Sequence, residues 1–109
     1  MKYFDSPPYM INHIVIWRFK EAAAGKTKLE NIEAAVALLD GCRDLVPGIE
    51  RFEIVRGVAH PACTSDLMLV SAFSSQADLD AYQTHPTHQA LKPFMADAVA
   101  QRECMDYPN

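Results

Sequence analysis

The chain has 109 residues, of which 50% are hydrophobic and 22% are charged, and its formal net charge is −4. This size and composition predict one small domain with its own core. No cluster of Lys or Arg supplies the basic surface that phosphate backbones require, so nucleic acid is not an expected partner. The three cysteines, Cys42, Cys63 and Cys104, are scattered, which fits reduced thiols better than a disulfide framework.

The start of the chain and the distribution of apolar residues indicate a cytoplasmic protein. The segment MKYFDSPPYM lacks the apolar run of a signal peptide, and about 18 consecutive apolar residues occur nowhere in the chain. We therefore expect no membrane partner. Residues 1–9 contain Ser6-Pro7-Pro8 and are expected to form an irregular leader. A single domain is expected over residues 10–109.

The first predicted element is a strand over residues 11–20, INHIVIWRFK, which is dense in β-branched and aromatic residues. Because side chains alternate along a strand, one face carries Ile11, His13, Val15, Trp17 and Phe19. Ile14 and Ile16 lie on the other face. Large apolar groups on both faces predict cover on both sides, by the domain's own helices and by a second copy of the chain.

The middle of the chain predicts a helix and two strands. Residues 26–46 have helical spacing in their apolar positions, and Pro47-Gly48 marks the end of this helix. The apolar stripe is formed by Leu29, Ile32, Val36, Leu39 and Val46. Alternation over residues 49–58 predicts a half-exposed strand, and apolar residues on both faces predict a central strand over residues 66–73.

The last third predicts a helix in two pieces and a final strand. Ser75 and Asp78 form a helix start, and a second start follows at Thr84-His85-Pro86, where proline suits the first turn. Residues 102–107 are expected to form the fourth strand. The order β-α-β-β-α-β predicts an α+β, ferredoxin-like fold, in which helices cover one face of a four-stranded antiparallel sheet.

Several motifs resemble the stress-responsive dimeric α/β-barrel (Dabb) family. They are His13-Ile14-Val15 with Phe19-Lys20, Val46-Pro47-Gly48-Ile49, Ser65-Asp66-Leu67 with Phe73, Leu79, Tyr82 with His85-Pro86-Thr87-His88, and Asp106-Tyr107. The resemblance runs from Met10 to Tyr107, and the HPxH motif after a tyrosine is its most specific part. It implies a homodimer in which two sheets meet face to face, with a pocket between each sheet and its helices.

The resemblance also implies roles for individual residues. In plant polyketide cyclases of this family, a tyrosine and a histidine at the positions of Tyr82 and His88 act as a pair. His88 would then be the general base, and Tyr82 would donate a hydrogen bond to a carbonyl or enolate oxygen. The expected binding residues are His13, Val15, Trp17 and Leu69. Leu67 stands where the cyclases carry a further pocket histidine, which argues against cyclisation of the same substrate type.

The histidines allow other interpretations. His13 fits either a core histidine with one satisfied hydrogen bond or a pocket residue that polarises a ligand carbonyl. His85 and His88 have the i, i+3 spacing of a cation site, but no third ligand is near in sequence. Folding would have to bring up Asp66, His60 or Cys63. We therefore predict neither a metal site nor an organic cofactor, and interpret His85 as a helix-boundary residue.

Two classes of function remain open at this point. One is proton-transfer chemistry of the cyclase, isomerase or lyase type on a small carbonyl compound. The other is a non-catalytic, stress-associated dimer with a structural role or a role in binding a hydrophobic ligand. The enzyme class requires the Tyr82 hydroxyl and an imidazole nitrogen of His88 to lie beside the same open cavity. A His88 that is sealed in the core or turned to bulk solvent would exclude it. The identity of the ligand and the pathway are beyond the sequence.

Overall fold

The computed structural model describes residues 9–58, 62 and 65–109 of the chain. The expected leader, apart from Tyr9, lies outside the described residues. The elements, in chain order, are β1 (Ile11–Phe19), β2 (Ala22–Ala23), β3 (Lys26–Thr27), α1 (Lys28–Asp40), β4 (Ile49–Arg56), β5 (Leu67–Phe73), α2 (Gln76–Thr84), α3 (Pro86–Ala98) and β6 (Val99–Pro108). This is the predicted β-α-β-β-α-β order with an added hairpin, β2–β3.

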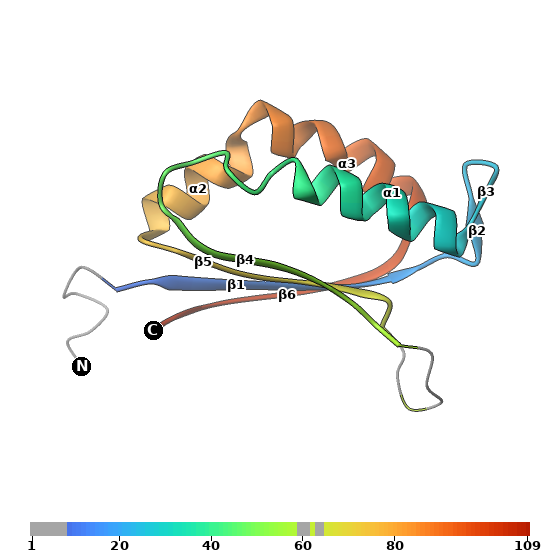
Figure 1. Cartoon of the computed structure of the whole chain (residues 1–109), viewed down its shortest axis with the longest axis horizontal. Helices are drawn as coiled ribbons and strands as arrows, with labels where there is room; N and C mark the ends of the chain where they lie inside the picture. Colours follow the sequence, from blue (N-terminus) through green and yellow to red (C-terminus); the bar gives the residue numbers. More distant parts are fainter. Residues whose placement is uncertain (1–8, 59–61, 63–64) are drawn as a thin grey trace.

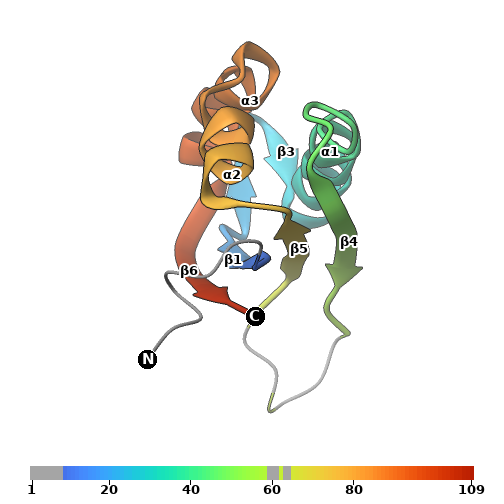
Figure 2. The same cartoon turned by 90° about the vertical axis from the view of Figure 1, so that its left-hand side faces the viewer.

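The four long strands form one antiparallel sheet in the order β4-β5-β1-β6. All three helices lie on one face of this sheet (Figures 1 and 2). The predicted ferredoxin-like fold is therefore confirmed. β1 is an inner strand, and its His13 lies opposite Ser71 of β5 and Asp106 of β6. Segments from the start, the middle and the end of the chain thus meet around His13.

The helix α1 is shorter than the prediction of residues 26–46. It begins after Thr27, whose hydroxyl accepts from the Glu30 amide at 3.2 Å while the Glu30 carboxylate accepts from the Thr27 amide at 2.9 Å. This reciprocal capping box fixes the start, and the helix ends before Gly41. Leu29 belongs to the predicted apolar stripe but not to the core, because it is 67% exposed in the first turn of the helix.

The break between α2 and α3 determines where Tyr82 and His88 lie. Ser75 caps α2 by accepting from the Asp78 amide, as the sequence predicted. His85 ends α2 and also caps α3, and Pro86 occupies the first turn of α3. Tyr82 therefore lies in the last turn of α2 and His88 in the first turn of α3. The predicted helix start at residues 84–86 is confirmed.

The core lies between the sheet and the helices. Its buried side chains include Val15, Trp17, Phe19, Leu39, Phe52, Leu69, Phe73, Leu79, Tyr82 and Leu91. No helix or strand of the described ranges covers the opposite face of the sheet (Figure 1). That face carries Ile14, Ile16, Val55, Met68, Val70, Met105 and Tyr107. None of the helices in the described residues is long and apolar enough to span a membrane.

Candidate active site

A cavity of about 560 Å³ lies between the sheet and the helices α2 and α3. Its apolar wall includes Val15, Trp17, Leu39, Leu69, Leu91 and Met95. Its polar lining consists of His13, Tyr82, Gln83, His88, Lys92, Gln101 and Arg102. The six residues that the sequence analysis assigned to a site, His13, Val15, Trp17, Leu69, Tyr82 and His88, all line this cavity. Their chemical roles stay predictions.

Tyr82 and His88 face each other across the break between the two helices. Their ring centroids are 4.7 Å apart, with an angle of 61° between the rings. The rings of Phe73 and Phe52 hold Tyr82 from other sides, at 5.0 Å and 6.1 Å. No protein group in the described ranges hydrogen-bonds to the Tyr82 hydroxyl or to Nδ1 of His88, although both atoms are buried. Within the described residues, the protein thus leaves both polar atoms unsatisfied, and both residues line the cavity.

The surroundings move the pKa values of this pair apart. Burial raises the pKa of Tyr82 above its ordinary value, and the Cys42 thiol adds to that effect. Burial lowers the pKa of His88 to about 4, as do the nearby Lys92, His13 and Arg102, while a hydrogen bond with the Gln83 main chain acts in the opposite direction. At neutral pH the pair thus consists of a neutral phenol, which donates, and a neutral imidazole, which accepts.

His13 approaches the same cavity from the sheet. Its Nδ1 contacts the Asp106 carboxylate across the β1–β6 ladder, and the Ser71 hydroxyl donates to its main-chain carbonyl at 2.8 Å. Because a carboxylate can only accept, this contact places a ring proton on Nδ1. His13 thus combines the two interpretations of the sequence, since it has a satisfied hydrogen bond and also lines the cavity.

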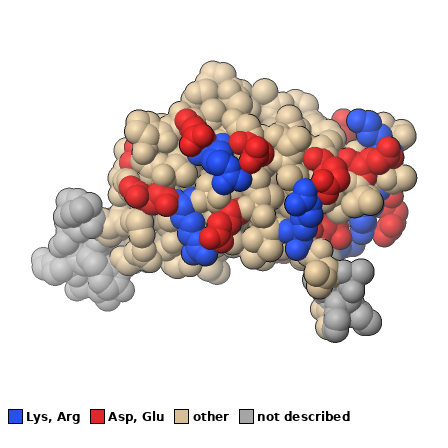
Figure 3. All heavy atoms as spheres, in the orientation of Figure 1, with Lys and Arg blue, Asp and Glu red and all other residues tan. Residues whose placement is uncertain are grey.

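Sequence reasoning did not assign Asp106 to the site. Asp106 belongs to a motif of the family resemblance, but its pairing with His13 depends on the register of β6 against β1. The sequence reasoning also missed two cationic side chains, Lys92 and Arg102, which are exposed residues of the cavity lining. On the face drawn in Figure 3, acidic and basic side chains of the described residues are interspersed. Lys92 and Arg102 therefore reach the cavity because of their places in the fold, and no cluster of basic residues in the sequence marks them.

The histidine pair of the HPxH motif is divided between two tasks. His85 accepts from the Thr87 amide through Nδ1 at 3.1 Å, which is its role as the cap of α3. His88 instead turns its ring towards Tyr82. Of the possible third ligands, Asp66 accepts from the Phe19 amide at 2.8 Å, and His60 and Cys63 lie outside the described residues. In the described part of the chain, no group of three metal ligands includes His85 or His88.

The fold and the cavity define a class of small ferredoxin-like α+β domains with a pocket between sheet and helices. The sequence matches the family model of the stress responsive A/B barrel domain (Dabb) over residues 11–109. The chain therefore belongs to the Dabb family, as its motifs indicated. A comparison with curated protein sequences found no significant match.

Solved structures with the same fold cover nearly the whole chain. A dimeric ferredoxin-like protein of unknown function from Bacteroides fragilis is 25% identical, with a TM-score of 0.78 over 92% of this chain and 96% of that one. A dimeric ferredoxin-like protein from Thermobifida fusca is 20% identical, with a TM-score of 0.80 over 94% and 92%. The hydroxynitrile lyase from Passiflora edulis is 18% identical, with a TM-score of 0.76 over 94% and 95%.

Proposed function

We propose that the chain is a homodimeric enzyme that binds a small carbonyl compound in the cavity and transfers a proton by acid–base catalysis. The observation that carries the proposal is that Tyr82 and His88 line one cavity, and that the Tyr82 hydroxyl and Nδ1 of His88 are buried without a hydrogen-bond partner in the described residues. Burial keeps both groups neutral at pH 7, so that the phenol can donate a hydrogen bond and the imidazole can accept a proton. The resemblance to plant polyketide cyclases assigns the same two residues.

The proposed step needs no group beyond these side chains. Nδ1 of His88 takes a proton from the carbon next to the carbonyl, and the electron pair of that C–H bond moves onto the carbonyl oxygen. The Tyr82 hydroxyl donates a hydrogen bond to this oxygen as negative charge develops. The proton on His88 then returns to the intermediate at the same or another atom, which gives exchange, isomerisation or ring closure.

The lining of the cavity suggests the kind of ligand. The apolar wall formed by Val15, Trp17 and Leu69 favours a hydrocarbon or aromatic body. Lys92 and Arg102 favour an anionic group at one end of that ligand. Since one structural neighbour is a hydroxynitrile lyase, hydroxynitriles belong among the compounds to test.

The homodimer is proposed from the bare face of the sheet. Met105 is 66% exposed on this face, and Val55 and Tyr107 are also exposed. Ile14 and Ile16 lie beside them on β1. The same face also carries Arg51, Glu53 and Glu103. Its exposed apolar residues mark an interface, and a second copy would cover them as the family resemblance implies. The structural neighbours from B. fragilis and T. fusca are dimeric.

The test is exchange of carbon-bound hydrogen for deuterium. We expect the wild type to accelerate loss of the α-proton signal in ²H₂O for at least one member of a panel of aryl ketones, β-keto acids and β-diketones. His88→Gln should reduce the rate by about 10²-fold or more, because a positioned base contributes that much. His85→Gln is the matched control, since His85 does not line the cavity. A compound that binds without exchange would favour the alternative, a non-catalytic stress-associated dimer that binds ligands.

A further inference from the structure

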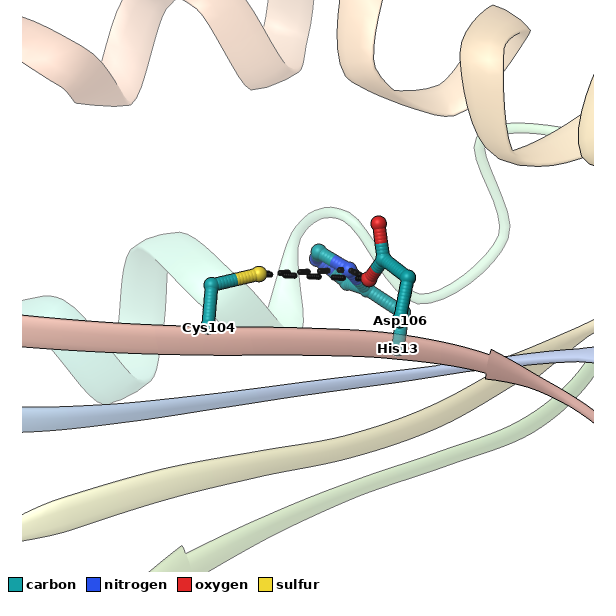
Figure 4. A group of neighbouring side chains, drawn as sticks. All are labelled: His13, Cys104 and Asp106. Atoms are coloured by element: carbon teal, nitrogen blue, oxygen red, sulfur yellow. Dashed lines mark hydrogen bonds and ion pairs between the residues drawn. The ribbon is translucent and has the colours of Figure 1, made fainter.

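Three side chains that the proposed reaction does not combine converge at the β1–β6 edge of the sheet. His13 comes from β1, and Cys104 and Asp106 come from β6, two positions apart on the same face of that strand. Figure 4 shows their polar ends turned towards one point on the helix side of the sheet. The Cys104 sulfur is 3.8 Å from Nδ1 of His13 and 3.9 Å from Oδ1 of Asp106. Nδ1 of His13 and Oδ1 of Asp106 are in direct contact.

The geometry argues against a nucleophilic cysteine. A thiol–imidazole–carboxylate relay places the thiol and the carboxylate on opposite ring nitrogens, whereas Cys104 and Asp106 both approach Nδ1 of His13. Burial and the Asp106 carboxylate raise the pKa of the Cys104 thiol, despite the opposing effect of Arg102. Reactive cysteines have lowered pKa values. Three potential ligand atoms around one point are instead typical of a site for a metal cation.

We propose that His13 Nδ1, Cys104 Sγ and Asp106 Oδ1 bind a divalent cation of the zinc class. Imidazole, thiolate and carboxylate together suit Zn²⁺ or Co²⁺, whereas Mg²⁺ and Ca²⁺ prefer oxygen ligands alone. Bond lengths of about 2.0–2.3 Å in a tetrahedral site put ligand atoms about 3.3–3.6 Å apart. The distances from the Cys104 sulfur to His13 Nδ1 and to Asp106 Oδ1 are already close to these values. Only the Asp106 carboxylate must move away from Nδ1 of His13 to make room for the ion.

Exposure and charge favour this site. The His13 side chain is 3% exposed, while that of Asp106 is 40% exposed, which leaves space for the carboxylate to adopt another rotamer. One thiolate and one carboxylate neutralise the dication. Binding displaces the protons on the Cys104 thiol and on Nδ1 of His13. Three protein ligands leave a fourth position for water or a small molecule.

The site shares His13 with the cavity, so the cation would act on the pocket. In the metal-free pair, Nδ1 carries a proton towards the Asp106 carboxylate. With the cation on Nδ1, the ring proton lies on Nε2, which is then a donor. The metal would therefore fix the orientation and the tautomer of His13 beside the cavity.

Cobalt substitution tests the site directly. Chelator-treated protein is titrated with Co²⁺, and we expect a thiolate-to-cobalt charge-transfer band in the near ultraviolet that saturates at one ion per chain and is bleached by Zn²⁺. Cys104→Ser should abolish the band, and Asp106→Asn should weaken the apparent affinity at least about tenfold. Both residues are exposed, so both variants should fold.

The other two cysteines provide the controls. Cys42→Ala should keep the band, because Cys42 does not belong to the cluster. Cys63→Ser should also keep the band if His13, Cys104 and Asp106 are the protein ligands. The proposal is overturned if wild-type protein gives no charge-transfer band, or if the band survives Cys104→Ser. It is also overturned if Asp106→Asn binds Co²⁺ as tightly as the wild type does, since a cysteine alone would then hold the ion.

Discussion

The rings of Tyr82 and His88 meet at 4.7 Å, and the protein gives neither the Tyr82 hydroxyl nor His88 Nδ1 a hydrogen-bond partner within the described residues. This relationship links the local sequence to the proposed function. The cap at His85 and the proline at position 86 start a new helix four residues after Tyr82. The change of helix lets α2 contribute the tyrosine and α3 the histidine to the same cavity.

His88 should titrate far below an ordinary histidine. Its pKa is about 4 in the folded chain, against about 6.5 in the unfolded chain. Below pH 6.5 the unfolded chain therefore binds a proton that the folded chain does not. The contribution of His88 to stability is complete above pH 6.5 and is lost as the pH falls towards 4. Histidine-resolved NMR should show the low midpoint directly.

The same linkage is measurable in the free energy of unfolding. As the pH falls from 6.5 to 4, the free energy of unfolding of the wild type should fall by about 2 kcal/mol because of His88, after allowance for partial exposure of the ring. His88→Gln should not show this fall. Denaturant unfolding at a series of pH values measures the difference. His85→Gln should keep the wild-type loss. Parallel pH profiles for wild type and His88→Gln would contradict the assigned pKa.

Tyr82→Phe should separate the contribution of the hydroxyl to the free energy of unfolding from that of the ring. The phenyl ring keeps the contacts with Phe73 and Phe52, and the lost hydroxyl has no protein partner in the described part of the chain. The free energy of unfolding should therefore stay within about 1 kcal/mol of the wild type or rise. Tyr82→Ala should lower it by about 3–5 kcal/mol. A Tyr82→Phe variant as unstable as Tyr82→Ala would show that the hydroxyl has a structural role.

A bulky residue at the cavity lining should exclude ligands without unfolding the protein. Ala96 is exposed and lines the cavity, whereas Ala90 is exposed on the same helix and does not. Both Ala→Trp substitutions carry the same small cost in helix propensity. We expect Ala96→Trp to weaken the binding of any ligand found by thermal shift about tenfold or more, which corresponds to about 1.4 kcal/mol. Equal binding by the two variants would place the ligand elsewhere.

A charge on the bare sheet face should prevent dimerisation. Met105 and Leu29 are 66% and 67% exposed, but only Met105 lies on that face. Met105→Lys should sediment as a monomer at micromolar concentration, because an unpaired charge would be buried against the second copy. Leu29→Lys should remain a dimer. A monomeric wild type, or a dimeric Met105→Lys, would contradict the proposed interface.

The fold followed from the sequence because each element carried its own local signal. Alternating β-branched and aromatic residues predicted β1, and the serine and proline at the starts of α2 and α3 predicted the broken helix. The start of α1 was placed too early, since residues 26 and 27 form β3 and the capping box begins at Thr27. The exposure of Leu29 was not predicted, because apolar spacing does not reveal which turn of a helix faces solvent.

The candidate site was predictable only in part. Motif resemblance selected Tyr82, His88 and His13, which the cavity brings together. The contact of Asp106 with His13 depends on strand register, and the proximity of Cys104 depends on the same register. Pairing between residues 93 positions apart leaves no periodic pattern in the sequence. The lowered pKa of His88 likewise arises from burial, which folding alone creates.

The pH dependence of catalysed α-proton exchange tests the central claim most directly. If neutral His88 is the base, the rate with a substrate of constant charge stays level from neutral pH down to about 5 and falls through an apparent pKa near 4. His88→Gln should lack the catalysed rate at every pH. A wild-type rate that falls through pH 6.5, or a catalysed rate that persists in His88→Gln, would contradict the assignment of His88 as the base.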